Sequence, residues 1–163
     1  MLVCEDAVKI DTSHVLWEGA IVGFLGQADW EFLEDVIDAH AIKSVVEFGS
    51  GLSTDLFVAK GLEVVSYEDH EEWFEMKAAV YPGVVREWDG GRVDIGHPDL
   101  VFIDGPWDLS LRGPAFKSAW GAAPRFIAVH DYVMPQVQKI YRAMKKYPLV
   151  GYTGLTLVVS AGE

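Results

Sequence analysis

Cysteine is almost absent from this sequence, because Cys4 is the only thiol among 163 residues. A single thiol cannot form a disulfide within the chain, which excludes the class of small secreted proteins stapled by disulfides. Residues 1–6 contain no basic segment leading into an apolar stretch, as a secretory signal would. No apolar run approaches the about 20 residues that a membrane span needs. We therefore expect a soluble, cytoplasmic protein that does not enter a membrane.

Basic residues are also scarce, with 13 Lys and Arg against 25 Asp and Glu and a formal net charge of −12. Affinity for nucleic acid comes mainly from clustered Lys and Arg, so we expect no nucleic-acid partner. A basic cluster does occur at Lys139, Arg142, Lys145 and Lys146. Its helical spacing is typical of a solvated helix face.

The length and the apolar content favour one folded domain. A chain of 163 residues that is 50% hydrophobic can bury a full core but leaves little room for a second one. We expect a single domain over residues 1–163, with residues 1–26 as an N-terminal extension. Glycines interrupt this extension, and its segment Val3–Ile10 fits either a short strand or a helix.

From residue 27 onward, segments with helical periodicity alternate with short apolar runs typical of buried strands. Helices are predicted over residues 27–40, 53–60, 69–80, 112–121 and 137–146, and strands over 44–48, 62–68, 84–88, 100–103, 125–129, 149–152 and 155–159. Residues 89–98 are rich in glycine and are predicted to form a loop or a short hairpin. Such alternation indicates an α/β fold, with a mostly parallel sheet covered by helices on both faces.

The stretch from Ser44 to Thr54 is read as a strand, a tight turn and the start of a helix. Glycine at positions 49 and 51 permits positive φ angles and lets a ligand approach the backbone. The first N–H groups of the following helix attract negative charge, so a nucleotide-like cofactor could bind there. Glycines also make ordinary strand-to-helix turns, which is the competing interpretation. Glu68 favours the cofactor, since it ends the next strand where a carboxylate can accept ribose hydroxyls.

Polar residues follow every predicted parallel strand at its carboxyl end. They are Glu47 and Gly49, Glu68, Trp88 and Asp89, Asp104, and His130 with Asp131. Because ligands of open α/β sheets bind beyond these ends, we expect the functional site at this edge.

This order of signals resembles the class I S-adenosylmethionine-dependent methyltransferases from about Gln27 to the end of the chain. Glu47–Gly51 is similar to the first motif of that family, and Asp99–Gly105 to its fourth-strand motif. Ile103–Gly105 together with Val129–Tyr132 more loosely resembles O-methyltransferases of the catechol and macrocin types. The resemblance implies a Rossmann-like, doubly wound sheet of seven strands with an antiparallel C-terminal strand. It also implies S-adenosylmethionine as cofactor and methyl transfer as activity.

The resemblance also implies roles for individual residues. The cofactor would be bound by Glu47, Gly49, Ser50, Gly51, Glu68, Trp88, Asp89 and Asp104. Within this set the glycine loop approaches the methionine part, Glu68 holds the ribose, and Trp88 and Asp89 border the adenine. Core packing is the alternative interpretation of Trp88.

Asp104, His130 and Asp131 are the candidate catalytic residues. Methyl transfer needs an aligned nucleophile and a group that accepts its proton. His130 is favoured as the base because its unperturbed pKa lies close to neutrality. The alternative is that His130 and Asp131 only cap their strand and bind loop amides. In catechol-type enzymes carboxylates at these two strand ends hold magnesium, and Asp104 and Asp131 match two such positions. That pattern also includes an asparagine, and this sequence has none, so a magnesium cofactor stays an open alternative and no residue is assigned to a metal.

Other functions stay open at this point. A dinucleotide-binding dehydrogenase would be expected to have a third glycine where this chain has Thr54. A binding protein could retain cofactor affinity without transferring a methyl group. For an enzyme, the expected acceptor is a hydroxyl of a small molecule or glycan. Its pocket would be shaped by loops 89–98 and 105–114, with Trp107, or by a second subunit of a homodimer.

Overall fold

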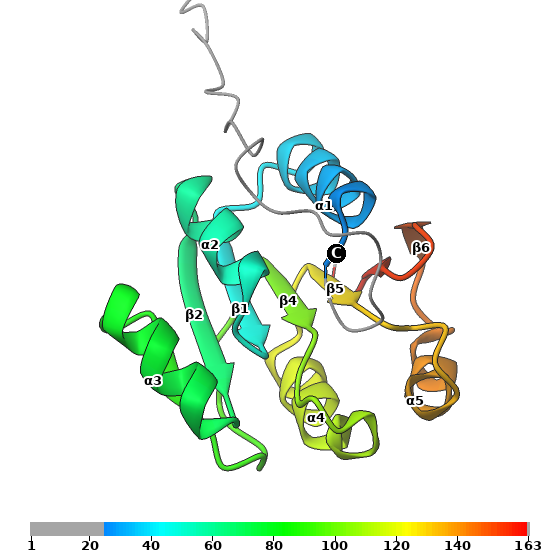
Figure 1. The fold of residues 1–163 in the computed structure, drawn as a ribbon. Coiled ribbons are helices and arrows are strands. Elements are labelled where there is room, and N and C mark those ends of the chain that lie inside the picture. The colour runs from blue at the N-terminus through cyan, green and yellow to red at the C-terminus, as the bar shows by residue number, and fades with distance from the viewer. Residues whose placement is uncertain (1–24, 163) are drawn as a thin grey trace, which may run out of the picture.

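The computed structural model describes residues 25–162, so the predictions for Val3–Ile10 and most of the N-terminal extension lie outside it. Its elements in chain order are α1 (Gln27–Ala39), β1 (Ser44–Phe48), α2 (Leu52–Ala59), β2 (Glu63–Glu68), α3 (Glu71–Val80), β3 (Val85–Glu87), β4 (Leu100–Ile103), the 3-10 turn η1 (Leu109–Leu111), α4 (Gly113–Ala122), β5 (Phe126–Val129), α5 (Pro135–Met144), β6 (Leu149–Tyr152) and β7 (Leu157–Ser160). Strands β2, β1, β4 and β5 lie side by side with helices around them (Figure 1).

All seven strands form one sheet in the order β3-β2-β1-β4-β5-β7-β6. The first five are parallel to one another, whereas β7 runs antiparallel to both β5 and β6. The order reverses direction between β1 and β4, which is the point where open α/β sheets bind their ligands. The predicted fold class is therefore confirmed: a mostly parallel seven-stranded sheet with an antiparallel C-terminal strand.

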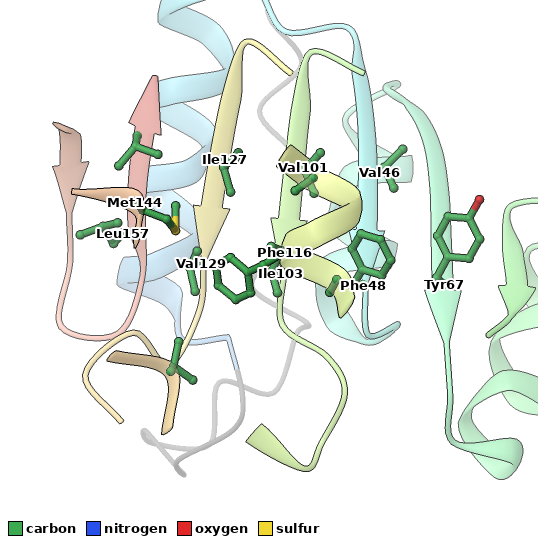
Figure 2. Packing of buried hydrophobic residues seen from close by; sticks show 14 of the residues in the cluster. Val46, Phe48, Tyr67, Val101, Ile103, Phe116, Ile127, Val129, Met144 and Leu157 are labelled. Carbon is green, nitrogen blue, oxygen red and sulfur yellow. The ribbon is translucent and has the colours of Figure 1, made fainter. Parts of the chain in front are cut away.

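The sheet is buried on both faces because helices cover each of them, and alternate residues of each strand point to opposite sides. Phe48 and Ile103 point to one face, where they join Phe116 of α4 and Met144 of α5 in a core cluster (Figure 2). On the other face a second cluster contains Val45 together with Leu33 of α1 and Phe57 of α2. Helices on both faces explain why strands such as β4 and β5 contain only apolar residues.

Local signals place most element ends within a few residues of their predicted positions. Gly61 follows α2 at φ 78°, and Pro135 occupies the first turn of α5. Residues 89–98 contain no helix or strand, as expected for a loop. Helix α3 differs from a core helix, because Trp73 and Val80 on its apolar side are exposed. Within residues 25–162, no helix combines the length and the apolarity that a membrane crossing would demand.

Candidate active site

A cavity of about 500 Å³ lies at the carboxyl edge of the sheet, where the sequence predicts the functional site. Its wall contains the loop Gly49–Gly51 after β1, Glu68 at the end of β2, and Asp104 with Gly105 after β4. Helix α2, helix α3 with Trp73 and Lys77, and the loop residue Trp107 supply further wall residues. Three predicted segments from adjacent strands thus meet at one hollow.

Gly49 is a glycine because the backbone of the neighbouring loop passes directly beside it. Its φ angle is 91°, and a Cβ built on it would lie 2.6 Å from the backbone nitrogen of Gly105. Gly51, in contrast, has extended backbone at φ −175° and open space where a Cβ would point. The loop is therefore packed tightly at Gly49 and open at Gly51, which leaves room for a ligand against the backbone.

Glu47 is placed beneath the glycine loop and does not line the cavity. It shares a strand face with Val45, so its carboxylate points toward α2 and accepts hydrogen bonds from the hydroxyls of Ser53, Thr54 and Ser66. Burial raises its pKa from 4.5 to about 7, against the opposing effect of these three hydroxyls. Glu47 thus fixes the start of α2 under the loop, and any direct contact with the cofactor remains a prediction.

Glu68 lies in the cavity wall, as the ribose-binding prediction requires. One carboxylate oxygen accepts hydrogen bonds from the backbone N–H and the hydroxyl of Ser50, both at 2.7 Å. The other oxygen accepts a bond of 2.9 Å from the N–H of His70. A carboxylate offers about four acceptor sites, so one site remains for a ligand hydroxyl.

Trp88 and Asp89 do not line the cavity. Trp88 is 3% exposed, packs on Phe48 with ring centroids 5.0 Å apart, and donates its indole N–H to the carbonyl of Gly91 at 2.7 Å. Asp89 accepts a bond from the N–H of Gly91 at 2.8 Å and so shapes the same turn. The structure explains Trp88 as a core residue, and contact of either side chain with an adenine remains a prediction.

Of the three candidate catalytic residues, Asp104 is the one that lines the cavity. Its side chain is 16% exposed, whereas His130 is fully buried and the side chain of Asp131 is 3% exposed. Burial raises the pKa of Asp104 to about 6, although the charges of His130 and Arg112 act in the opposite direction. A carboxylate in the wall with a raised pKa can accept a proton near neutral pH.

His130 and Asp131 lie behind Asp104 and are held by the C-terminal part of the sheet. The Nδ1 atom of His130 lies 2.9 Å from the hydroxyl of Thr156. Its Nε2 atom lies 3.7 Å from Oδ1 of Asp131, and neither atom has a hydrogen-bond partner among the described residues. Asp131 has a φ angle of 57°, which turns the chain sharply after β5. The structure thus brings the predicted trio together, with one member facing the cavity.

One wall of the cavity and one buried charge were not predicted from the sequence. The wall comes from α2 and α3, where Lys77 forms an ion pair of 2.7 Å with Asp55, and Trp73 of α3 lines the same cavity. No sequence signal set this wall apart, because a single tryptophan on a helix surface is ordinary. The buried charge is Arg112, which gave no signal because a single arginine in a loop is usually solvated.

No protein-family profile matches the sequence, and no curated protein matches it either. Solved structures match in fold. A putative caffeoyl-CoA O-methyltransferase from Staphylococcus aureus is 16% identical, with a TM-score of 0.64 over 84% of this chain and 85% of that chain. An O-methyltransferase from Bacillus cereus in complex with SAH is 16% identical, with a TM-score of 0.60 over 91% and 94%.

The O-methyltransferase TomG from Streptomyces achromogenes, in complex with SAM, gives a TM-score of 0.59 at 16% identity, over 92% of this chain and 94% of that chain. At a sequence identity of 16%, structural similarity establishes the fold but not the activity. The described residues have the fold of the class I S-adenosylmethionine-dependent methyltransferases.

Proposed function

We propose that this protein is an S-adenosylmethionine-dependent methyltransferase that methylates a hydroxyl group of a small molecule or glycan. The proposal is supported by the set of residues that form one wall of the cavity. It combines the glycine loop, the carboxylate of Glu68 and the carboxylate of Asp104, whose pKa is raised to about 6. These are the parts that a nucleoside-containing methyl donor and a proton acceptor need.

The residues of the cavity fit the cofactor. The open backbone at Gly51 leaves space for the methionine part, and Glu68 accepts a ribose hydroxyl at its remaining acceptor site. Rotation of the Ser50 hydroxyl away from Glu68 frees a second acceptor site for the other ribose hydroxyl. When bound, S-adenosylmethionine supplies an electrophilic methyl group on a sulfonium.

Asp104 is the proposed base because it is the member of the trio that borders the cavity. Its carboxylate takes the proton of the acceptor hydroxyl as that oxygen bonds to the methyl carbon and the sulfonium–carbon bond breaks. The products are a methyl ether and S-adenosylhomocysteine, with the proton on Asp104. His130 and Asp131 are proposed to support Asp104 from behind, since both are buried in this structure.

The acceptor is proposed to bind near the two tryptophans of the cavity. Trp107 is 72% exposed and Trp73 is 38% exposed, and both line the wall. Exposed indole rings suit an aromatic acceptor or the apolar face of a sugar. Two structural neighbours support a small-molecule acceptor, since one is a putative caffeoyl-CoA O-methyltransferase and the other, TomG, is involved in tomaymycin synthesis.

Calorimetric titration with S-adenosylmethionine and, separately, with NAD tests the proposal. The protein should bind the methyl donor and not NAD. Asp104→Asn should retain this binding but lose transfer in a screen of phenols and sugars with labelled methyl donor. Binding of NAD alone, or of neither ligand, would contradict the proposal. A wild type that binds the donor yet methylates nothing in the screen would favour a binding protein of the same fold.

A further inference from the structure

Arg112 carries a charge that the fold encloses completely. It directly precedes α4, is 2% exposed, and is the largest of the fully buried side chains in the described part of the chain. Burying a guanidinium is costly unless every donor finds a partner and a nearby charge balances it. The position of its partners therefore indicates what this charge is for.

The guanidinium joins the two loops that follow β4 and β5. Its Nε donates to the carbonyl of Pro106 at 3.2 Å, and Nη1 donates to the carbonyl of His130 at 3.0 Å. Nη2 donates to the carbonyl of Asp104 at 2.7 Å and to Oδ2 of Asp131 at 3.3 Å. The same Nη2 lies 3.6 Å from Oδ1 of Asp104, so it stands between the two carboxylates.

The geometry points to Arg112 as an internal cation that takes the place of a divalent metal between Asp104 and Asp131. This inference rests on the proposed methyl transfer and makes Arg112 a positioning residue for Asp104. It supplies a fixed positive charge that holds one carboxylate toward the cavity and the other behind it. Arginine suits this role because it stays protonated at any pH the protein meets.

A divalent ion does not fit beside this guanidinium. Asp104, His130 and Asp131 do bring three possible ligand atoms within 4.8 Å of one another. However, Oδ1 of Asp104 and Oδ2 of Asp131 already face Arg112, and a dication that shared them would be repelled by its charge. The buried atoms of this trio that lack a hydrogen-bond partner are Nε2 of His130 and Oδ1 of Asp131. One of these two atoms is a ring nitrogen, whereas Mg²⁺ prefers an octahedral shell of oxygen ligands.

Titration with Mn²⁺ tests the inference directly, with calorimetry as the readout and no acceptor required. Wild type and Asp131→Asn should give the same isotherm, because the carboxylate pair holds no ion in the wild type. An Mn²⁺ site in the wild type that Asp131→Asn abolishes would overturn the inference.

Variants of Arg112 test whether its positive charge is what excludes a divalent ion. Arg112→Gln removes the charge, so Mn²⁺ binding should appear and should be lost again when Asp131→Asn is added. Arg112→Lys keeps a positive charge and should bind no Mn²⁺, like the wild type. A folded Arg112→Gln variant that binds no Mn²⁺ would refute exclusion by charge. Should that variant fail to fold, an Mn²⁺ site in Arg112→Lys or in the wild type would still refute it.

The proposed function fails by a different measurement. A wild type that binds S-adenosylmethionine and also binds Mn²⁺ through Asp131 overturns the role of Arg112 alone. A wild type that binds neither S-adenosylmethionine nor Mn²⁺ overturns the methyl transfer, and with it the positioning role of Arg112 toward Asp104.

Discussion

Replacement of Glu47 by glutamine removes a charge that the fold buries beneath the glycine loop. The glutamine oxygen can still accept a hydrogen bond, and its amide N–H groups can donate to hydroxyls that now accept. Ser53, Thr54 and Ser66 permit this exchange, because a hydroxyl both donates and accepts. We therefore expect Glu47→Gln to fold, with a different dependence of stability on pH.

The magnitude follows from the pKa of Glu47, which burial raises from 4.5 to about 7 in the folded protein. Between these two pH values the unfolded chain has lost the proton that the folded protein still binds. The free energy of unfolding therefore falls as the pH rises through this window, and the loss is complete above about pH 7. A shift of this size corresponds to a loss of about 3 kcal/mol in the wild type.

Urea unfolding followed by tryptophan fluorescence measures this effect near pH 4.5 and near pH 8. The stability of Glu47→Gln relative to the wild type should rise by about 3 kcal/mol between the two conditions. Glu63→Gln is a matched control, because Glu63 is an exposed carboxylate at the start of β2. If the stability difference between Glu47→Gln and the wild type is constant across this pH range, the pKa of Glu47 is not raised in the folded protein and the prediction is wrong.

Three further predictions concern the cavity. Glu68→Gln should weaken S-adenosylmethionine binding about 10- to 100-fold in calorimetry, since a hydrogen bond to a charged acceptor contributes about 1.5–3 kcal/mol. The control Glu72→Gln, at an exposed residue of α3, should have no effect on this binding. Gly49→Ala should lower the free energy of unfolding by about 1–3 kcal/mol more than Gly61→Ala does. Both glycines have a positive φ, but only a Cβ at position 49 would meet a neighbouring backbone. Equal losses in the two variants would refute the close approach of the two loops at Gly49. The methylation rate should rise with pH around a midpoint of about 6, where Asp104 ionises, and a flat profile would exclude Asp104 as the base.

Most of the fold could be predicted from the sequence because its strongest signals are local. The four apolar residues of β4 and of β5 are all buried, as a run without polar interruption predicts for a central strand. Helix starts were less certain. Helix α3 begins at Glu71, two residues after the predicted start, because Asp69 and His70 still belong to the turn after β2.

The sequence predicted the edge of the sheet where the cavity lies, but it could not fully give the direction of each side chain. Glu47 was assigned to the cofactor, yet the period of two along β1 puts it on the same face as Val45, under α2. That signal was available in the sequence. The burial of His130 was not, because it depends on the pairing of β5 with β7 and on the contact with Thr156, which joins residues 26 positions apart.

The burial of Arg112 can be explained by charge balance once the strand order is known. Strands β4 and β5 are neighbours, and each is followed by an aspartate close to its carboxyl end. The partly buried carboxylate of Asp104 and the buried one of Asp131 therefore lie together, and a nearby cation stabilises them. The chain between these aspartates offers Arg112, Lys117 and Arg125 as basic residues. Lys117 is exposed, and Arg125 pairs with an aspartate that precedes β4, at the opposite edge of the sheet. Arg112 is then the basic residue in this segment that can balance the pair, and its enclosure follows from the electrostatics of two adjoining strand ends.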